Sequence, residues 1–204
     1  MTFYMYKYVR KAINMVENLL DRAIIFATNA HSGAFRKGTN LPYIVHPLET
    51  LAVVSSMTDD PEILAAAVLH DVLEDTAATK EQLREKFGAR VTNLVSAESE
   101  EKQNDKPRAD TWKQRKQETL DVLKNEKDIA VKMIVLGDKL SNIRSMHSDF
   151  ERIGDELWER FNQKDVREHA WYYNEIAYAV KELEIYNAYK EYESVLRMLF
   201  GHIL

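Results

Sequence analysis

The stretch ILAAAVLHDVLED, residues 63–75, decides the fold of this chain. Seven apolar residues lead directly into a His-Asp pair, and a Glu-Asp pair follows within the next turn. Asp60 and Pro61 precede the run as an N-cap residue and a first-turn proline, which is a common way for a helix to start. The pattern predicts a buried helix that continues through the His-Asp pair to Leu73.

The ionisable side chains of this stretch are those of His70, Asp71, Glu74 and Asp75. Residues four apart share a helix face, so each member of the first pair is expected beside the matching member of the second. Three carboxylates this close repel one another unless a cation neutralises them. The alternative is a solvated helix end, which is disfavoured because negative charge is unfavourable at a helix C-terminus. The stretch therefore favours a metal site.

The rest of the chain also has the pattern of helices. Glycine and proline number only 6 and 4 in 204 residues, and apolar residues recur at spacings of three and four. Further helices are predicted over residues 13–24, 79–87, 89–95, 111–123, 127–147, 164–183 and 187–200. Residues 99–109 are polar and are predicted to form a loop. A helical segment is expected to end near Gly154. No segment alternates as a strand would, so the sequence predicts an all-α fold.

The domain organisation follows from length and from the placement of these helices. A chain of 204 residues is the size of one domain, so residues 1–204 are predicted to form a single domain. Its motif-bearing core covers roughly residues 20–183, and a C-terminal helix covers roughly residues 187–200.

The composition narrows the class of protein. The formal net charge is −5, which argues against a protein that binds nucleic acid through its phosphates. The sequence has no cysteine, so disulfides, thiolate metal ligands and cysteine nucleophiles are excluded. Residues 1–11 lack the features of a signal peptide, and the apolar run 63–69 is far shorter than the ~20 residues of a membrane span. We therefore expect a cytoplasmic protein with neither a membrane nor a nucleic-acid partner.

Two further residues are candidates to complete the metal site. Mn²⁺ or a similar ion takes about six nitrogen and oxygen ligands, which one His-Asp pair cannot supply. His46 lies in the segment PYIVHP, whose last proline opens an apolar helix, and Asp138 is a lone acid in an apolar helical stripe. Taken alone, His46 is equally a satisfied core histidine, and Asp138 is equally an ion-pair partner of Lys139 or Arg144.

Five segments together resemble a known family. They are FRKG (35–38), PYIVHP (42–47), LHDVLEDT (69–76), FG (87–88) and GDKLSNIR (137–144). The succession of His, His-Asp and Asp is that of the HD phosphohydrolases, and the flanking residues are similar to those of the hydrolase domain of the RelA/SpoT proteins. With no synthetase domain expected in 204 residues, the chain is most similar to the stand-alone small alarmone hydrolases, which include the metazoan SpoT homologue.

This resemblance implies an activity and a set of site residues. Members of the family remove the 3′-diphosphate of the guanosine alarmones (p)ppGpp in the stringent response, releasing pyrophosphate and GDP or GTP, and they use Mn²⁺. The implied ligands of one Mn²⁺ ion are His46, His70, Asp71 and Asp138. The implied catalytic pair, which positions and activates the attacking water, is Glu74 and Asp75. The implied contacts to the guanosine moiety are Arg36, Lys37 and Asn142.

Two other functions fit parts of the pattern. One is an HD phosphatase acting on another nucleotide, such as an adenosine alarmone, a deoxynucleotide or NADPH. The other is an alarmone sensor without catalysis, which the complete set of ligands and acids disfavours. Without the resemblance, Arg36 and Lys37 belong equally to an ordinary charged loop.

Several features are left open by the sequence. The basic residues of one predicted helix could meet the pyrophosphate or form a solvated face; they are Lys113, Arg115 and Lys116. An aromatic cluster could pack in the core or lie near the substrate; it consists of Trp171, Tyr172 and Tyr173. His31 is expected to have a structural role or to support the ligands. Gly137 replaces the family's usual alanine, which alone should only loosen its helix slightly. The oligomeric state is undetermined, with a homodimer as one option.

Overall fold

The computed structural model describes residues 18–98 and 111–203. Over these residues the chain is helical and contains no β-strand; an isolated β-bridge joins Phe35 and Pro42. The α-helices are α2 (Leu19–Ala30), α3 (Val45–Ser55), α4 (Pro61–Leu69), α5 (Val72–Asp75), α6 (Lys80–Glu98), α7 (Trp112–Asn125), α8 (Ile129–Ile153), α9 (Val166–Ala179) and α10 (Asn187–Phe200). Two 3₁₀ helices are η1 (Gly154–Arg160) and η2 (Lys181–Leu183). The predicted all-α fold is confirmed.

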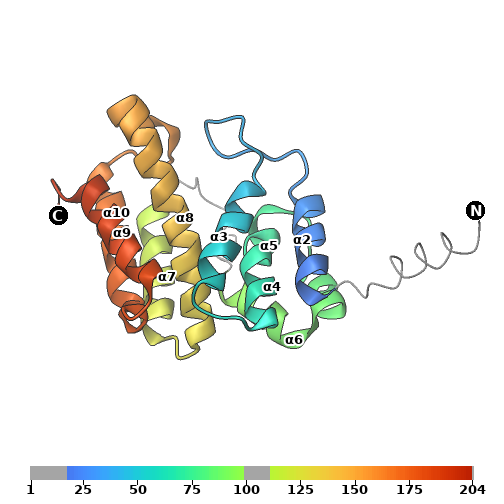
Figure 1. Ribbon diagram of the computed structural model, residues 1–204. Helices are drawn as coiled ribbons and strands as arrows, with labels where there is room; N and C mark the ends of the chain where they lie inside the picture. Colours follow the sequence, from blue (N-terminus) through green and yellow to red (C-terminus); the bar gives the residue numbers. More distant parts are fainter. Residues whose placement is uncertain (1–17, 99–110, 204) are drawn as a thin grey trace, which may run out of the picture.

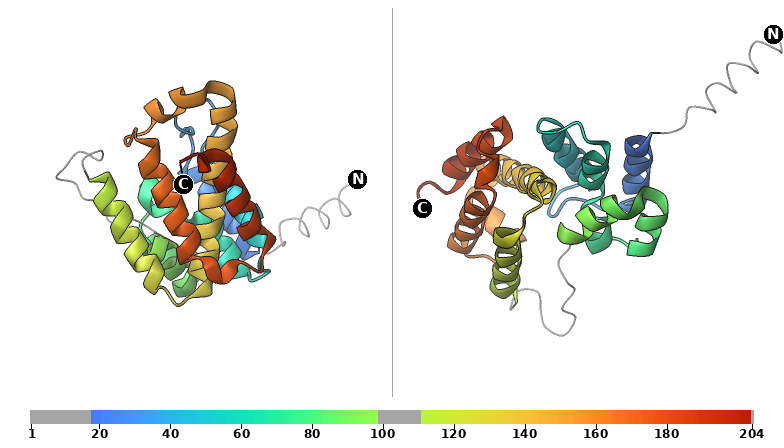
Figure 2. Two further views of the ribbon diagram at one scale, coloured as in Figure 1. Left: turned by 90° about the vertical axis from the view of Figure 1, so that its left-hand side faces the viewer. Right: turned by 90° about the horizontal axis from the view of Figure 1, so that it is seen from below.

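Helix α8 runs through the middle of the molecule and divides it into two groups of helices. Helices α2 to α6 lie on one side of α8, and helices α7, α9 and α10 lie on the other (Figures 1 and 2). Helix α8 packs against α3 on the first side and against α10 on the second. None of the helices in the described part of the chain combines the length and the apolar character that crossing a lipid bilayer requires.

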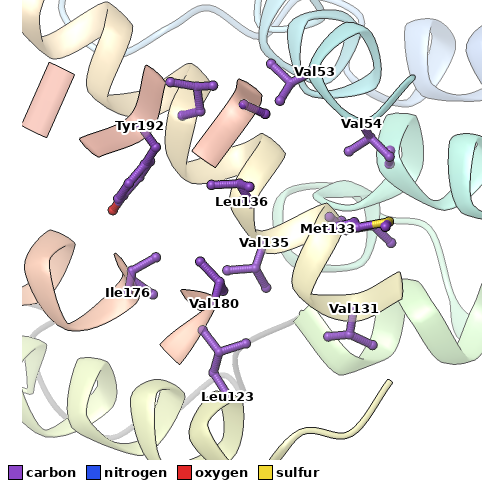
Figure 3. Packing of buried hydrophobic residues seen from close by; sticks show 14 of the residues in the cluster. Val53, Val54, Leu123, Val131, Met133, Val135, Leu136, Ile176, Val180 and Tyr192 are labelled. Carbon is purple, nitrogen blue, oxygen red and sulfur yellow. The ribbon is translucent and has the colours of Figure 1, made fainter. Parts of the chain in front are cut away.

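The central position of α8 explains its composition. Every residue from 130 to 138 is buried, so this part of the helix is enclosed on all sides rather than along one stripe. Figure 3 shows Val53 and Val54 of α3 near one side of α8, with Ile176 of α9 and Tyr192 of α10 on the other side. The acid in this run, Asp138, is thus placed inside the protein by the packing of its neighbours.

The predicted helix boundaries have the expected local causes. The side chain of Asp60 accepts hydrogen bonds from two backbone N–H groups in the first turn of α4, as an N-cap residue does. Thr79 and Gln82 cap α6 reciprocally, with each side chain bonded to the other residue's backbone N–H. Gly88 has a φ of 86° and interrupts α6, which confirms the predicted end of one helix and start of the next.

Some boundaries differ from those expected. The helix predicted to reach Leu73 ends at Leu69, and α5 begins only at Val72, with His70 and Asp71 forming a turn between the two helices. Helix η1 was not predicted, since its sequence lacks an apolar period. The first predicted helix, residues 13–24, lies partly outside the described residues. The predicted loop 99–109 lies wholly outside them.

Gly137 marks the closest approach of α3 and α8. A Cβ atom at this position would lie 2.8 Å from Cγ2 of Val54 and 3.1 Å from the backbone oxygen of Thr50. The expectation that glycine here only loosens the helix therefore missed its main effect, which is to let the two helices pack closely. These two helices also carry His46 and Asp138, so their spacing sets the spacing of those side chains.

We predict that Gly137→Ala lowers the free energy of unfolding by on the order of 1 kcal/mol, although alanine favours helix formation. Overpacking a core costs about 1–3 kcal/mol, whereas replacing glycine by alanine inside a helix gains about 1 kcal/mol. Urea denaturation measures the difference. The matched test adds Val54→Ala, which makes room for the new methyl group, so Gly137→Ala should cost less in that background. A more stable single variant would contradict the packing argument.

Candidate metal centre

Three elements bring a group of buried metal-binding side chains together. His46 lies in the first turn of α3, His70 directly follows α4, and Asp138 lies in α8. One nitrogen or oxygen atom from each of the three lies within 4.8 Å of the others. Nε2 of His46 is 3.2 Å from Nε2 of His70 and 3.1 Å from Oδ1 of Asp138. All three side chains are buried.

Asp71 adds a carboxylate to this group. Its Oδ2 atom is 3.0 Å from Nε2 of His70 and 3.3 Å from Nε2 of His46. Asp71 is less buried than the other three, so it lies at the solvent side of the cluster. The structure thus brings together all four residues that the sequence suggested as metal ligands.

Hydrogen bonds orient the two imidazoles so that their Nε2 atoms face the cluster. Nδ1 of His70 is 2.9 Å from the backbone oxygen of Ala67, which can only accept, so this nitrogen carries the proton in the neutral ring. Nδ1 of His46 bonds to Ser141. Two imidazole lone pairs and two carboxylates then converge, and such acceptors repel one another unless a cation lies between them. This set of nitrogen and oxygen donors fits a divalent metal ion.

Both carboxylates are held in the ionised form that a metal ligand requires. Burial alone would raise the pKa of Asp138, but the positive charge of the Lys139 ammonium holds that pKa well below its usual value. Burial would likewise raise the pKa of Asp71, and positive charge on the neighbouring His70 and His46 rings, in their protonated form, lowers it. Asn142 also donates from Nδ2 to Oδ1 of Asp138 at 2.5 Å. A metal can therefore bind here without displacing protons from the acids.

Tyr43 is a residue of this site to which the sequence analysis gave no role. Its hydroxyl lies 2.7 Å from Oδ2 of Asp71 and 2.7 Å from Oδ2 of Asp75. Burial, followed by the two carboxylates, raises the pKa of Tyr43, so the phenol keeps its proton and donates it. Tyr43 thus links a candidate ligand to a candidate catalytic acid. The position of Tyr43, three residues before His46, is the sequence feature that could have indicated this role.

The candidate catalytic acids lie at the rim of the cluster. Glu74 is half-buried and Asp75 is exposed, and both belong to the single turn of α5 that follows Asp71. The backbone N–H of Asp75 bonds to the oxygen of Asp71 at 2.9 Å, so the two residues stay close despite the break in the helix. Both acids are therefore positioned beside the metal ligands and toward solvent.

The three candidate guanosine-binding residues have different surroundings. Arg36 donates to Oδ1 of Asn142 at 2.9 Å, and Asn142 in turn donates to Asp138, which ties both residues to the cluster. The Arg36 guanidinium also lies 5.8 Å from the centre of the Tyr43 ring. Lys37 instead lies over the ring of Phe161, at 5.8 Å from its centre. Arg36 and Asn142 thus adjoin the cluster, and no bond in the described residues joins Lys37 to it.

The residues left open by the sequence have identifiable environments. His31 is buried against the Tyr43 ring, and its Nε2 atom has no hydrogen-bond partner in the described residues. Lys113 pairs with Glu168 and lies over the Trp171 ring. Tyr172 and Tyr173 are buried, in agreement with the packing interpretation of these two aromatics.

Comparison with known proteins defines the class to which this fold and site belong. Residues 23–164 match the HD domain, and the chain belongs to the HD domain family. It is similar to the guanosine-3′,5′-bis(diphosphate) 3′-pyrophosphohydrolase of Haemophilus influenzae, with 37% identity over 126 residues, or 61% of this chain and 18% of that protein. It is also similar to the bifunctional (p)ppGpp synthase/hydrolase SpoT of Escherichia coli K12, with 36% identity over 132 residues, or 63% of this chain and 18% of that protein. The chain therefore matches about a fifth of these relatives.

Solved structures support the same fold. A metazoan orthologue of SpoT, described as hydrolysing ppGpp, superposes with a TM-score of 0.68 over 91% of this chain and 95% of that chain, at 22% identity. A protein of Listeria monocytogenes EGD-e superposes with a TM-score of 0.66 over 76% of this chain and 99% of that chain, at 26% identity. The helical arrangement around α8 is thus that of known proteins of similar length.

We predict that a divalent metal ion stabilises this protein and that Asp138→Asn removes the effect. An ion present at 100 times its dissociation constant stabilises the folded state by about 2.7 kcal/mol. Thermal unfolding with Mn²⁺ and with a chelator measures this shift. Asp149→Asn is the matched control, because Asp149 is a half-buried carboxylate paired with Arg160 outside the cluster. An undiminished metal response in Asp138→Asn would remove that residue from the ligand set.

Proposed function

We propose that this chain is a metal-dependent hydrolase that removes the 3′-diphosphate of (p)ppGpp, giving pyrophosphate and GDP or GTP. One observation carries the proposal: the chain of hydrogen bonds from Arg36 through Asn142 to Asp138. It puts a guanidinium, which stacks well on a purine, directly beside a cluster suited to a metal ion. The names of the relatives from Haemophilus influenzae and Escherichia coli support the same activity.

The proposed metal is one Mn²⁺ ion, with His46, His70, Asp71 and Asp138 as its protein ligands. Their two nitrogen and two carboxylate donors suit manganese and leave positions for water and substrate oxygens. When bound, the ion supplies Lewis-acid polarisation of the phosphoryl group and lowers the pKa of coordinated water. The ligands themselves keep their geometry through the bonds to Ala67, Ser141, Asn142 and Tyr43.

Glu74 and Asp75 are proposed to handle the proton of the attacking water. Carboxylates next to the ligands can accept this proton and orient the water toward the phosphorus that bears the ribose 3′-oxygen. The bond between that phosphorus and the 3′-oxygen then breaks, and the 3′-oxygen takes up the proton that the carboxylate removed from the water. Tyr43 shares its single hydroxyl proton between Asp71 and Asp75, and this contact limits the directions in which the Asp75 carboxylate can face. The balance is one water consumed for each pyrophosphate released.

Arg36, Lys37 and Asn142 are proposed to hold the nucleoside. The guanidinium of Arg36 is already fixed by Asn142 and by the Tyr43 ring, so it needs little further ordering to stack on a base. Lys37 can reach the nucleotide only by leaving the Phe161 ring. A single domain comprising residues 1–204 is part of the proposal, and a cytoplasmic location stays a prediction.

The test is turnover of ppGpp by the purified protein with Mn²⁺ and with a chelator, with products resolved by ion-exchange chromatography. We expect metal-dependent release of GDP and pyrophosphate in equal amounts. Release of inorganic phosphate would identify a different bond as the one cleaved. Absence of turnover in a metal-loaded protein would contradict the proposed substrate. Because a guanidinium stacks on any purine, adenosine alarmones and NADPH are the next substrates to assay.

We predict that Glu74→Gln retains the metal but loses turnover by about 100-fold or more, since a general acid or base contributes about 10²- to 10⁴-fold. Steady-state kinetics and metal analysis of the same preparation measure the two properties. Glu85→Gln, an exposed glutamate of α6, serves as the control and should behave as the unchanged protein. Full turnover by Glu74→Gln would exclude Glu74 from proton transfer.

A further inference from the structure

A second chain of hydrogen bonds leads away from the metal cluster toward the C-terminal helix. Nδ1 of His46 is 2.8 Å from Oγ of Ser141, and that hydroxyl donates to Oε2 of Glu49 at 2.7 Å. Oε1 of Glu49 accepts from Arg144 at 3.0 Å, and Arg144 also donates from Nε to Glu191 of α10 at 2.8 Å. These contacts connect α3, α8 and α10 on the side of His46 that faces away from the cluster.

The direction of each bond in this chain is determined by the groups at its end. Arg144 can only donate, and the carboxylate of Glu49 can only accept. The single hydroxyl proton of Ser141 is used on Glu49, so toward His46 this oxygen can only accept. Nδ1 of His46 must therefore carry the proton, which leaves the lone pair on Nε2, 3.1 Å from Asp138. This is the tautomer that can bind a metal from the side of the cluster.

His46 differs in this respect from His70. A backbone oxygen fixes the proton of His70 on Nδ1, so no substitution of a side chain changes that bond. The proton of His46 is fixed by a serine, which can donate as well as accept, and the serine depends on Glu49 for its direction. The side chain of Glu49 is 34% exposed, as is appropriate for a group that orients others rather than binding the ion.

We infer that Glu49 is a positioning residue of the metal centre: through Ser141 it fixes His46 in the metal-binding tautomer, and Arg144 fixes Glu49. The inference builds on the proposed function only in requiring that the cluster bind a metal ion. Residues that orient metal-bound histidines in this way commonly contribute about 10- to 100-fold to metal affinity. Because Arg144 also bonds to Glu191, helix α10 supports the site without contributing a ligand to it.

The substitution Glu49→Gln tests the direction of the bonds with little change in shape. Arg144 can only donate, so it should hold the amide oxygen of the new glutamine and turn the amide N–H₂ toward Ser141. The serine then accepts from the glutamine and donates to Nδ1 of His46, which favours the tautomer with its proton on Nε2. We expect the dissociation constant for Mn²⁺, measured from the electron paramagnetic resonance signal of the free ion, to rise by about 10- to 100-fold.

Two further variants separate this role from a general loss of stability. Glu62→Gln is the matched control, because Glu62 is 37% exposed and also pairs with an arginine, Arg90. It should leave the Mn²⁺ affinity unchanged. Arg144→Met in the Glu49→Gln background frees the amide to turn its oxygen to Ser141, so it should restore part of the lost affinity. A purely structural role for the Glu49–Arg144 pair predicts the opposite, a further loss.

Nuclear magnetic resonance of the metal-free protein, labelled with ¹⁵N in histidine, gives a direct view of the tautomer. We expect the Nδ1 proton signal of His46 in the unchanged protein and its loss or displacement in Glu49→Gln. Unchanged Mn²⁺ affinity together with an unchanged Nδ1 signal would overturn the inference. Loss of ppGpp turnover in every preparation, with the affinity difference intact, would instead contradict the proposed substrate and leave the role of Glu49 standing.

Discussion

The convergence of buried hydrogen-bond acceptors on one point is the constraint on which this structure depends. Nε2 of His46, Nε2 of His70 and an oxygen of Asp138 lie within 4.8 Å of one another in the interior, with Asp71 beside them. Such a group is unfavourable in a protein core unless its charges are compensated. The surrounding polar residues supply part of this compensation, because Lys139 and Asn142 donate to Asp138 while Tyr43 shares its hydroxyl proton between Asp71 and Asp75.

The helices on the two sides of α8 contribute differently to the site. The four candidate ligands come from α3, from the turn between α4 and α5, and from α8 itself, so the helices on one side build the cluster. Helix α10, on the other side, is connected to the cluster through Glu191 and Arg144. Arg36 enters from the loop before α3 and is joined to α8 by Asn142. The proposed metal chemistry and the proposed nucleotide recognition thus meet on one turn of α8, at Asp138 and Asn142.

Much of this arrangement could be predicted from sequence because it follows from local pattern. Asp60 and Gly88 act through their own backbone surroundings, so the boundaries that they set were predictable. A metal site at His70 and Asp71 was predictable from the cost of placing them at the end of an apolar run, whereas His46 and Asp138 joined the ligand set only through the resemblance to the HD phosphohydrolases. The role of Tyr43 was not, because its partners Asp71 and Asp75 are 28 and 32 residues away. Gly137 also depends on a long-range contact, and helix propensity alone gave no sign of it.

The separation of the ligands along the chain has a consequence for how the protein assembles. His46 and His70 are 24 residues apart, and Ser141, which orients His46, is 95 residues away from it. No short peptide from this chain contains the cluster, so the unfolded chain offers an ion the adjacent pair His70 and Asp71 without His46 and Asp138. The complete set of ligands exists only when α3, α4 and α8 are docked, which requires the loops between them to be closed. A bound ion would link α3, α4 and α8 in their folded arrangement. Its release must therefore precede or accompany the separation of these helices.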